Sequence, residues 1–290
     1  GAGPAGLAAA EQLRKLGYQI TIYDRYDRPG GLLIYGIPNF KLEKFVVERR
    51  TRLLEEGGIK FLQNFEVGKD STLDQLRKKH DAILIATGVY KPREIEVPGN
   101  NLANIFPAME FLTASNKKGL GDQVELFDRG ILNVEGKNVV VIGGGDTAMD
   151  CVRTAVRQNA KSVRCLYRRD KENMPGSARE VANAEEEGVE FVWLSSPKEF
   201  LGKNKVEGLI INKIKLGAPD DSGRRKPEIQ KDSEFKLNSD IIIKALGFDP
   251  ENLPKLFDTK DLQITRWGTL KTDFDTMETN LSGVFAAGDI

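Results

Sequence analysis

Two glycine-rich turns, far apart in the chain, carry the clearest chemical signal of this sequence. The first is Gly1-Ala2-Gly3-Pro4-Ala5-Gly6, and the second is Gly143-Gly144-Gly145-Asp146-Thr147-Ala148. Glycines at this spacing let a strand turn tightly into a helix whose N-terminus holds a pyrophosphate. Because each turn leads into an amphipathic helix and then a strand, the sequence predicts two dinucleotide sites in one chain.

The first turn has the full set of glycines and an acid at the expected distance. Gly1 permits the tight turn, Gly3 lets the backbone approach a phosphate, and Gly6 permits close packing of helix on strand. Asp24 ends the following strand, 18 residues after Gly6. This is near the ~20 residues at which an acid binds a ribose hydroxyl. We therefore expect Asp24 to bind the ribose.

The second turn is followed by bases instead of an acid. Its third glycine is replaced by Ala148, which this type of turn allows. The next strand ends in Tyr167-Arg168-Arg169. A guanidinium donates two parallel hydrogen bonds to a phosphate, each contributing about 1.5–3 kcal/mol. We expect Arg168 and Arg169 to favour NADPH over NADH by roughly ten- to a hundred-fold; a pair of solvated arginines is the alternative.

Three further strand ends carry small residues or an acid. Ala86-Thr87-Gly88 and Ala245-Leu246-Gly247 each end a buried strand, and Ala287-Gly288-Asp289 follows the last one. In a doubly wound sheet these ends border the ligand crevice. We expect Asp289 to hold the linker hydroxyls of a flavin dinucleotide, or to cap a following helix.

The apolar loop 30–42 follows the first βαβ unit and is stiffened by Pro38. It is predicted to lie over a flavin ring and to exclude water. Lys41 is its one cation, and a cation near a flavin raises the flavin potential. The alternative is a packed loop with a surface lysine.

Composition excludes several other classes of function. Lys+Arg and Asp+Glu both number 43, so no nucleic-acid or membrane surface is indicated. No apolar run approaches the ~20 residues that cross a bilayer. Cys151 and Cys165 lack metal or Cys-x-x-C spacing, and we expect two buried thiols in a reducing cytoplasm. His80 is the sole histidine and is expected to be exposed, which disfavours hydrolase chemistry.

The elements that must position these residues alternate between helix and strand. The βαβ unit recurs at 1–24 and at 138–169, and the range 198–237 is expected to form a meander with a polar turn at 218–225. This alternation predicts an α/β fold with two Rossmann-like, doubly wound, three-layer domains. Helices are expected at 4–16, 43–56, 72–79, 107–115, 146–158 and 177–187, and strands at 19–23, 60–63, 65–67, 81–86, 138–142, 162–167, 189–194 and 240–247.

Both ends of the chain suggest a piece of a longer protein. A glycine turn of this type follows a buried strand, whereas this chain opens on the first glycine. The last residues resemble the approach to a helix. We expect further elements at both ends.

With these residues identified, the chain resembles the small (β) subunits of NADPH-dependent glutamate synthases over essentially its whole length. The stretches at 30–42 and 166–181 are the most specific, and those at 1–6, 139–151 and 284–290 agree. Related modules occur in dihydropyrimidine dehydrogenase and in flavin subunits that exchange electrons with ferredoxin. The resemblance implies hydride transfer from NADPH to FAD, and then electron transfer through iron–sulfur clusters to a glutamate synthase large subunit that makes glutamate from glutamine and 2-oxoglutarate.

The resemblance also implies the domains and their cofactors. An FAD domain at 1–106 and 248–290 would be interrupted by an NADPH domain at 107–247, with no resident metal. The 4Fe–4S clusters of the family belong to a cysteine-rich N-terminal region that this sequence does not contain. The residues expected at FAD are Gly1, Gly3, Pro4, Ala5, Gly6, Asp24, Gly31, Leu32, Lys41, Val67, Ala86, Thr87, Gly88, Gly288 and Asp289, and those expected at NADPH are Gly144, Gly145, Asp146, Thr147, Arg168, Arg169, Ala245, Leu246 and Gly247.

Three alternatives to this function stay open. A disulfide reductase would share the two-dinucleotide plan but needs a cysteine pair near the flavin. A flavoprotein that feeds another acceptor, such as ferredoxin or a pyrimidine-reducing domain, would use the same module. A dinucleotide-binding sensor would keep the fold without turnover.

Overall fold

The computed structural model describes residues 1–219 and 225–290 and divides the chain into two compact units. Unit 1 comprises Gly1–Lys91 and Phe248–Ile290, and unit 2 comprises Pro92–Gly247. Unit 2 is thus a continuous segment inserted into unit 1. The expected domains change at 106/107 and at 247/248, and the two compact units change at 91/92 and at 247/248.

The first boundary differs because the segment 92–106 packs with unit 2. Its strand β5 (Ile105–Pro107) pairs in parallel with β13 (Ile241–Lys244). Pro98 and Gly99 therefore lie inside unit 2. Four apolar side chains of the segment pack against a buried cluster of unit 2: Ile95, Val97, Leu102 and Ile105.

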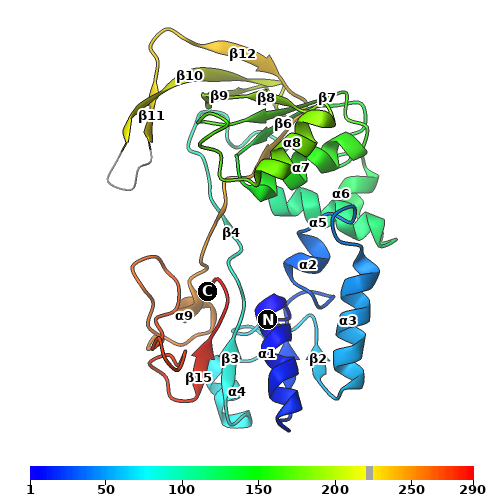
Figure 1. The fold of residues 1–290 in the computed structure, drawn as a ribbon, viewed down its shortest axis with the longest axis vertical. Helices are drawn as coiled ribbons and strands as arrows, with labels where there is room; N and C mark the ends of the chain where they lie inside the picture. The colour runs from blue at the N-terminus through cyan, green and yellow to red at the C-terminus, as the bar shows by residue number, and fades with distance from the viewer. Residues whose placement is uncertain (220–224) are drawn as a thin grey trace. The chain divides into compact units, whose positions relative to one another are not determined.

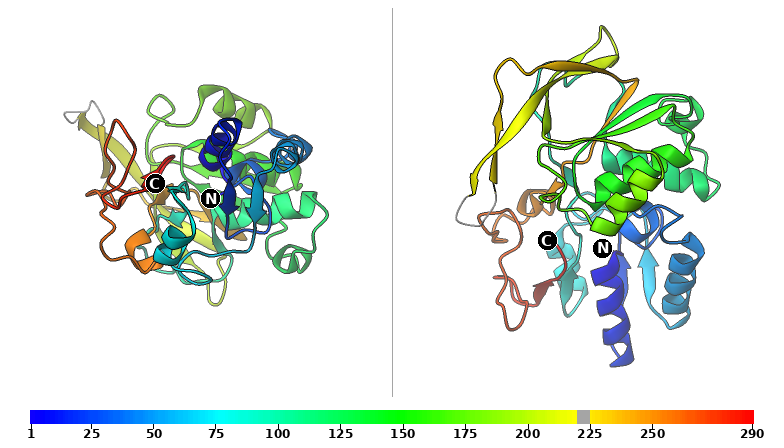
Figure 2. Two further views of the ribbon diagram at one scale, coloured as in Figure 1. Left: turned by 90° about the horizontal axis from the view of Figure 1, so that it is seen from below. Right: turned by 45° about the horizontal axis from the view of Figure 1, so that its top comes forward.

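Unit 2 consists of three layers around a parallel sheet (Figures 1 and 2). The sheet has the order β5-β13-β6-β7-β8. Val139 and Val141 of β6 pack with helices α5, α7 and α8 on one face. Val140 and Ile142 pack with the antiparallel strands β9, β10 and β12 on the other. The third layer is therefore a sheet and not a set of helices, although the α/β class and the three layers are as predicted.

Most elements of unit 2 lie in the expected ranges, but α5 continues to Gly119, past its expected end at 115, and β5 and α6 were not predicted. The antiparallel layer occupies the range expected to form a meander, and most of the polar turn expected there lies outside the described residues. The remaining elements are α5 (Ala108–Gly119), α6 (Glu125–Asp128), β6 (Asn138–Ile142), α7 (Asp146–Arg157), β7 (Ser162–Leu166), α8 (Ala178–Glu186), β8 (Glu190–Val192), β9 (Ser195–Leu201), β10 (Gly208–Pro219), β11 (Arg225–Ile229) and β12 (Phe235–Asn238).

Unit 1 contains two parallel strand pairs, β1-β2 and β3-β15. One apolar cluster joins α1, β1 and α3, and a second joins α4, β3, α9 and β15. The short strands β4 and β14 pair with each other, and they lie at the two points of the sequence where the chain passes from one unit to the other. The elements are α1 (Pro4–Lys15), β1 (Thr21–Tyr23), α2 (Leu32–Tyr35), α3 (Lys44–Glu56), β2 (Lys60–Leu62), α4 (Leu73–Lys79), β3 (Ile83–Ile85), β4 (Lys91–Pro92), β14 (Phe248–Asp249), α9 (Leu253–Leu256) and β15 (Val284–Ala286).

Two local predictions in unit 1 were wrong. The loop 30–42 contains the short helix α2, because Gly31 precedes it as the N-terminal flanking residue and Gly36 ends it. The range 65–67 forms no strand; Val67 makes only an isolated bridge with Ser71. Within the ranges 1–219 and 225–290, no helix combines the length and the apolar character that a membrane crossing needs.

Candidate dinucleotide-binding sites

The first glycine turn is fixed by close backbone approaches. A Cβ on Gly1 would lie 2.2 Å from the carbonyl oxygen of Ala86, at the end of β3. A Cβ on Gly6 would lie 2.0 Å from the carbonyl oxygen of Gly1. A Cβ on Gly3, in contrast, would meet nothing within 4 Å. Gly1 and Gly6 are therefore required by packing, whereas Gly3 faces the open space that a phosphate needs.

A cavity of about 260 Å³ opens in front of this turn. The hydroxyl of Thr87 is buried at its edge and has no hydrogen-bond partner among the described residues. Gly288, with φ +90, lies against Ala5 and brings the chain end to the turn. The cavity gathers most of the residues expected at the first site: Gly1, Gly3, Pro4, Ala5, Asp24, Gly31, Leu32, Val67, Ala86, Thr87, Gly88, Gly288 and Asp289.

Two residues expected at the first site lie outside the lining of this cavity. Gly6 is buried behind the turn, where it permits α1 to approach the strand. Lys41 is exposed. The lysine that reaches the backbone of loop 30–42 is Lys44, a buried residue whose ammonium donates to the carbonyls of Leu33 (3.0 Å) and Ile37. It thereby holds α2 in place.

Asp24 is buried and partly engaged by backbone amides. Its carboxylate accepts hydrogen bonds from the amides of Ala2 (2.5 Å) and Tyr26 (2.8 Å). A carboxylate has about four acceptor positions, so capacity is left for ribose hydroxyls. The acid thus both braces the glycine turn and faces the cavity.

Several cavity residues were missed by the sequence analysis. Arg25 donates to Glu251 at 2.9 Å, and its guanidinium lies 5.4 and 5.3 Å from the ring centroids of Tyr26 and Tyr90. Burial is the main cause that raises the pKa of Tyr90. Phe65 also lines this cavity. Arg25 follows Asp24 directly, and that adjacency was the one signal in the sequence that pointed to it.

The second glycine turn repeats the geometry of the first. A Cβ on Gly143 would lie 2.2 Å from the carbonyl oxygen of Ala245, at the end of β13, and a Cβ on Gly145 would meet nothing within 4 Å. Ala148, in the place of the third glycine, is fully buried. The carbonyl of Ala245 therefore packs against the second turn in the same way as the carbonyl of Ala86 packs against the first.

A loop at residues 168–177 returns to the second turn. The amide of Gly176 donates to the carbonyl of Gly144 at 2.9 Å, and the amide of Ser177 donates to Asp146 at 2.9 Å. Unit 1 has the same return, because the amide of Gly30 donates to the carbonyl of Ala2 at 2.8 Å. In both units the returning loop leads into a helix, α2 or α8.

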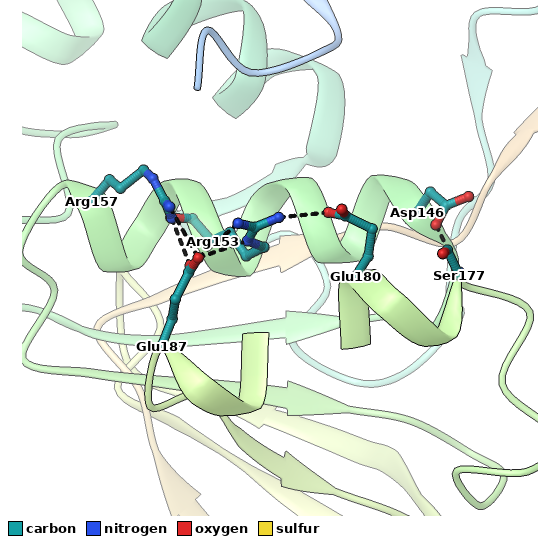
Figure 3. Close-up of polar contacts among 6 residues, drawn as sticks. All are labelled: Asp146, Arg153, Arg157, Ser177, Glu180 and Glu187. Atoms are coloured by element: carbon teal, nitrogen blue, oxygen red, sulfur yellow. Dashed lines mark hydrogen bonds and ion pairs between the residues drawn. The ribbon is translucent and has the colours of Figure 1, made fainter. Parts of the chain in front are cut away.

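An ion-pair network holds α8 against α7 (Figure 3). Arg153 lies 2.7 Å from both Glu180 and Glu187, and Arg157 lies 2.6 Å from Glu187. The hydrogen bond from Arg157, with help from Arg153, lowers the pKa of Glu187 to about 2. The network holds both ends of α8 against α7, because Glu180 lies in the first turn of α8 and Glu187 is its C-cap residue.

The two arginines expected at a 2′-phosphate have different surroundings. Arg168 is exposed and has no hydrogen bond or ion pair with the described residues. Arg169 is partly buried, and its Nε donates to the carbonyl of Arg225 at 3.3 Å. Arg168 is therefore the base that is available to a ligand.

At the remaining positions of the second site, Gly247 accepts a hydrogen bond from the amide of Arg93 at 3.0 Å, and Leu246 packs on the antiparallel layer. Thr147 is partly buried in the first turn of α7.

Cysteine and histidine do not form a reactive site in this structure. Cys151 and Cys165 are free and buried, and burial raises the pKa of Cys165 to about 12. His80 is partly buried and not exposed as expected, because its Nε2 lies 2.9 Å from the hydroxyl of Tyr23. Among the described residues, no cluster of histidine, cysteine and acids could hold a metal.

Two Rossmann-type units with matching glycine turns define the class of this chain. The profile of the pyridine nucleotide-disulphide oxidoreductase family matches residues 1–290, and the chain belongs to this family.

Within the family, the chain is similar to glutamate synthase (NADPH) small chains. It is 61% identical over 290 residues to that of Azospirillum brasilense, covering all of this chain and 60% of the relative. It is 42% identical over 293 residues to that of Halomonas elongata, covering all of this chain and 61% of the relative. These identities confirm the resemblance predicted from the motifs. The chain spans about 60% of the length of these relatives.

Solved structures confirm the fold. FprA from Mycobacterium tuberculosis, solved in complex with NADPH, superposes with a TM-score of 0.79 at 18% identity. The superposition covers 99% of this chain and 77% of FprA. At this identity the structural similarity shows the fold of this chain and does not show its ligands.

Proposed function

We propose that this chain is the dinucleotide-binding module of a glutamate synthase small chain, with FAD in unit 1 and NADPH in unit 2. The observation that carries the assignment is the contrast between Asp24, which faces a cavity, and Arg168, whose charge is unpaired in the described chain. A carboxylate accepts hydrogen bonds from ribose hydroxyls, whereas a guanidinium suits a 2′-phosphate.

The residues of unit 1 fit FAD. The open space at Gly3 and the N-terminus of α1 suit a pyrophosphate, and the unpartnered hydroxyl of Thr87 offers a further polar contact. Asp24 would hold the adenosine ribose, and Asp289 the linker hydroxyls. Leu32 would cover the apolar side of the cavity.

When bound, FAD supplies a two-electron acceptor for the hydride of NADPH. This reaction requires positioning and exclusion of water, and no side-chain acid or base. Residues of the chain would contribute by holding the two dinucleotides and by packing loop 30–42, which Lys44 of α3 braces through the carbonyls of Leu33 and Ile37. The proposal therefore names binding and positioning residues and no catalytic side chain.

The proposed partner is a glutamate synthase large subunit, because relatives that share 61% and 42% identity are glutamate synthase small chains. Electrons would reach it through iron–sulfur clusters outside the chain described here. Two buried free thiols support a location in the reducing cytoplasm.

The nucleotide assignment is tested by Arg168→Ala. Anaerobic stopped-flow mixing with NADPH should bleach the flavin of the wild type within milliseconds to seconds. Arg168→Ala should raise the apparent dissociation constant for NADPH roughly ten- to a hundred-fold and leave that for NADH nearly unchanged. Arg169→Ala is the matched control and should have a smaller effect. An equal loss for both coenzymes would refute the assignment, and bound FAD that never bleaches would indicate a sensor.

The physiological acceptor requires a separate experiment. The purified large subunit, glutamine and 2-oxoglutarate are added to the complete small chain with NADPH. Glutamate formed in proportion to the NADPH consumed is the expected result. Consumption of NADPH without glutamate would point to another acceptor, such as ferredoxin or a pyrimidine-reducing domain.

The disulfide reductase alternative finds no support in the cysteines. Both thiols are buried, and desolvation raises the pKa of Cys151 as well as that of Cys165. The thiolate is the reactive form, so neither cysteine is poised for disulfide exchange. Neither cysteine lines the cavity of unit 1.

A further inference from the structure

An arm of the antiparallel layer lies beside the segment that carries the two candidate arginines of unit 2. Strand β10 pairs with β9 and β12 over its first half and with β11 over its second half. We call this second part, residues 214–219 and 225–229, the arm (Figure 1). The arm is not part of the βαβ unit that contains the second glycine turn. A contact between the arm and that unit therefore joins two separate layers of unit 2.

Hydrogen bonds fix both ends of the arm to Arg169, in the segment that follows β7. At the base of the arm, the amide of Ile214 donates to the carbonyl of Leu194 at 2.6 Å, and the amide of Leu194 donates to the carbonyl of Arg169 at 3.1 Å. At the far end, Nε of Arg169 donates to the carbonyl of Arg225 at 3.3 Å. Arg225 is thus held next to the segment that contains Arg168.

The register of the arm decides which of its faces Arg225 occupies. Residues that pair directly across an antiparallel ladder lie on the same face, and successive residues of a strand alternate between the two faces. Leu216 pairs with Pro227, and both are half-buried, so they mark the inner face of the arm. Arg225 stands two residues before Pro227 and shares this inner face, whereas Lys226 lies on the outer face.

Three guanidinium groups therefore lie in one part of unit 2 with no acid to neutralise them. Arg168 and Arg225 are exposed, and neither side chain has a hydrogen bond or an ion pair with the described residues. Arg169 donates to the arm and has no ion pair within the ranges 1–219 and 225–290. Because like charges repel, such a group is stabilised by a bound anion. A phosphate suits it, since its oxygens accept paired hydrogen bonds from a guanidinium.

We propose that Arg225 of the arm binds the 2′-phosphate of the dinucleotide together with Arg168, and that Arg169 is a positioning residue that holds Arg225 in place. The inference rests on the proposed function, because it assumes that unit 2 takes NADPH. The second site is then completed by a strand of the antiparallel layer. Of the two arginines that follow β7, one contacts the ligand and the other braces the arm.

Arg225 allows a specific substitution, because only its backbone takes part in the contact with Arg169. Arg225→Gln removes the charge and leaves the carbonyl that accepts the hydrogen bond of Arg169. Lys226→Gln is the matched control, because it removes one charge from the next residue of the same strand, on the outer face.

The experiment measures by calorimetry how the holoprotein binds adenosine 2′,5′-bisphosphate and adenosine 5′-diphosphate. The wild type should prefer the bisphosphate. Arg225→Gln should weaken binding of the bisphosphate roughly tenfold, as the loss of one charged hydrogen bond implies, and should change binding of the 5′-diphosphate by no more than about twofold. Lys226→Gln should leave both affinities within about twofold of the wild type, because its charge is screened by solvent. Bound FAD and the thermal unfolding midpoint report whether each variant is folded.

A double-mutant cycle tests the positioning role of Arg169. Arg169→Ala should weaken binding of the bisphosphate less than Arg225→Gln does. In a chain that already carries Arg225→Gln, it should cause no further loss, because Arg169 acts only through Arg225. Losses that add in the double variant would show that Arg169 contacts the phosphate itself and would overturn its positioning role.

The remaining outcomes separate this inference from the proposed function. A wild type without preference for the bisphosphate would overturn the NADPH site, and the role of Arg225 with it. A preference that survives Arg225→Gln would overturn the role of Arg225 alone. An equal loss in Lys226→Gln would also overturn it, because the net charge of the arm and not a contact of Arg225 would then be responsible.

Discussion

At the scale of single residues, the two sites are built on the same contacts and differ in a few side chains. Gly1 and Gly143 each face a strand-end carbonyl that would lie 2.2 Å from an added Cβ. Real Cβ contacts do not approach 3 Å, so these positions admit glycine alone. The strand after each turn is then followed by Asp24 in one unit and by Tyr167-Arg168-Arg169 in the other. The side chains that we expect to choose the ligand thus differ between the units, whereas the geometry of the turns is the same.

Asp24 gives the prediction at this scale. Asp24→Asn keeps the size of the side chain but weakens the hydrogen bonds from the amide of Ala2 and from a bound ribose. Hydrogen bonds to a charged group contribute about 1.5–3 kcal/mol, so the dissociation constant of FAD should rise roughly ten- to a hundred-fold. Titration of the apoprotein with FAD, followed by flavin fluorescence, measures it.

Asp70→Asn is the matched control for this substitution. Asp70 accepts the amide of Glu66 at 2.7 Å, as Asp24 accepts that of Ala2, but it does not line the cavity. Its substitution should leave FAD binding unchanged. Wild-type affinity in Asp24→Asn, or an equal loss in both variants, would show that Asp24 does not hold the flavin.

The sequence could identify the residues whose role depends on local spacing. The first turn and Asp24 follow from a pattern within about 25 residues of chain, and each strand end follows from its own short stretch of sequence. Glu251 could not be found in this way, because it meets Arg25 across 226 positions of the chain. Lys44 was missed for another reason: the sequence does not show which of two neighbouring lysines, Lys41 or Lys44, turns inward.

At the scale of elements, α2 depends on one buried cation. Lys44 donates to the carbonyl of Leu33, which α2 itself leaves unsatisfied, and to the carbonyl of Ile37, just beyond the helix. Lys44→Met retains the length of the stem but removes both hydrogen bonds. The free energy of unfolding should fall by about 1.5–3 kcal/mol, measured by denaturant titration.

Lys41→Met is the neighbouring control. Because Lys41 is exposed, its substitution should lower the free energy of unfolding by less than that of Lys44 does. Equal stability of the two variants would mean that Lys44 does not brace the loop.

The contact between α7 and α8 predicts a pH dependence. Hydrogen bonds from Arg157 and Arg153 lower the pKa of Glu187 from 4.5 to about 2. A depressed pKa means that the ion pairs stabilise the fold above pH 4.5 and that this stability is lost as the pH falls toward 2. The free energy of unfolding of the wild type should therefore exceed that of Glu187→Gln most above pH 5. The difference should shrink as the pH falls below 4.5. A difference that is constant between pH 6 and pH 3 would contradict the role of Glu187.

The elements themselves were largely predictable, and the third layer of unit 2 was not. Helices and parallel strands were found from their apolar periods, and α1, α3 and α7 begin and end within about two residues of the predicted ranges. The strands β9 to β12 were expected as a meander, but nothing in their sequence showed which face of the parallel sheet they cover. That placement depends on contacts such as those of Phe200 and Leu209 with Val140.

At the scale of the whole molecule, the second unit is inserted into the first without sharing its core. The two apolar clusters of unit 2 draw all their residues from Pro92–Gly247. Its two ends are adjacent, because the amide of Arg93 donates to the carbonyl of Gly247 at 3.0 Å. A segment with its own core and adjacent ends meets the requirements of an independent domain.

Residues 92–247 expressed alone should therefore fold. We expect one cooperative thermal transition, binding of adenosine 2′,5′-bisphosphate in calorimetry and no bound flavin, because both buried clusters and the second turn lie within the segment. The same segment with Arg168→Ala should unfold at nearly the same temperature and lose most of the binding. A segment that unfolds without cooperativity would show that unit 2 needs unit 1 for its stability. A folded segment that binds FAD would reverse the assignment of the two sites.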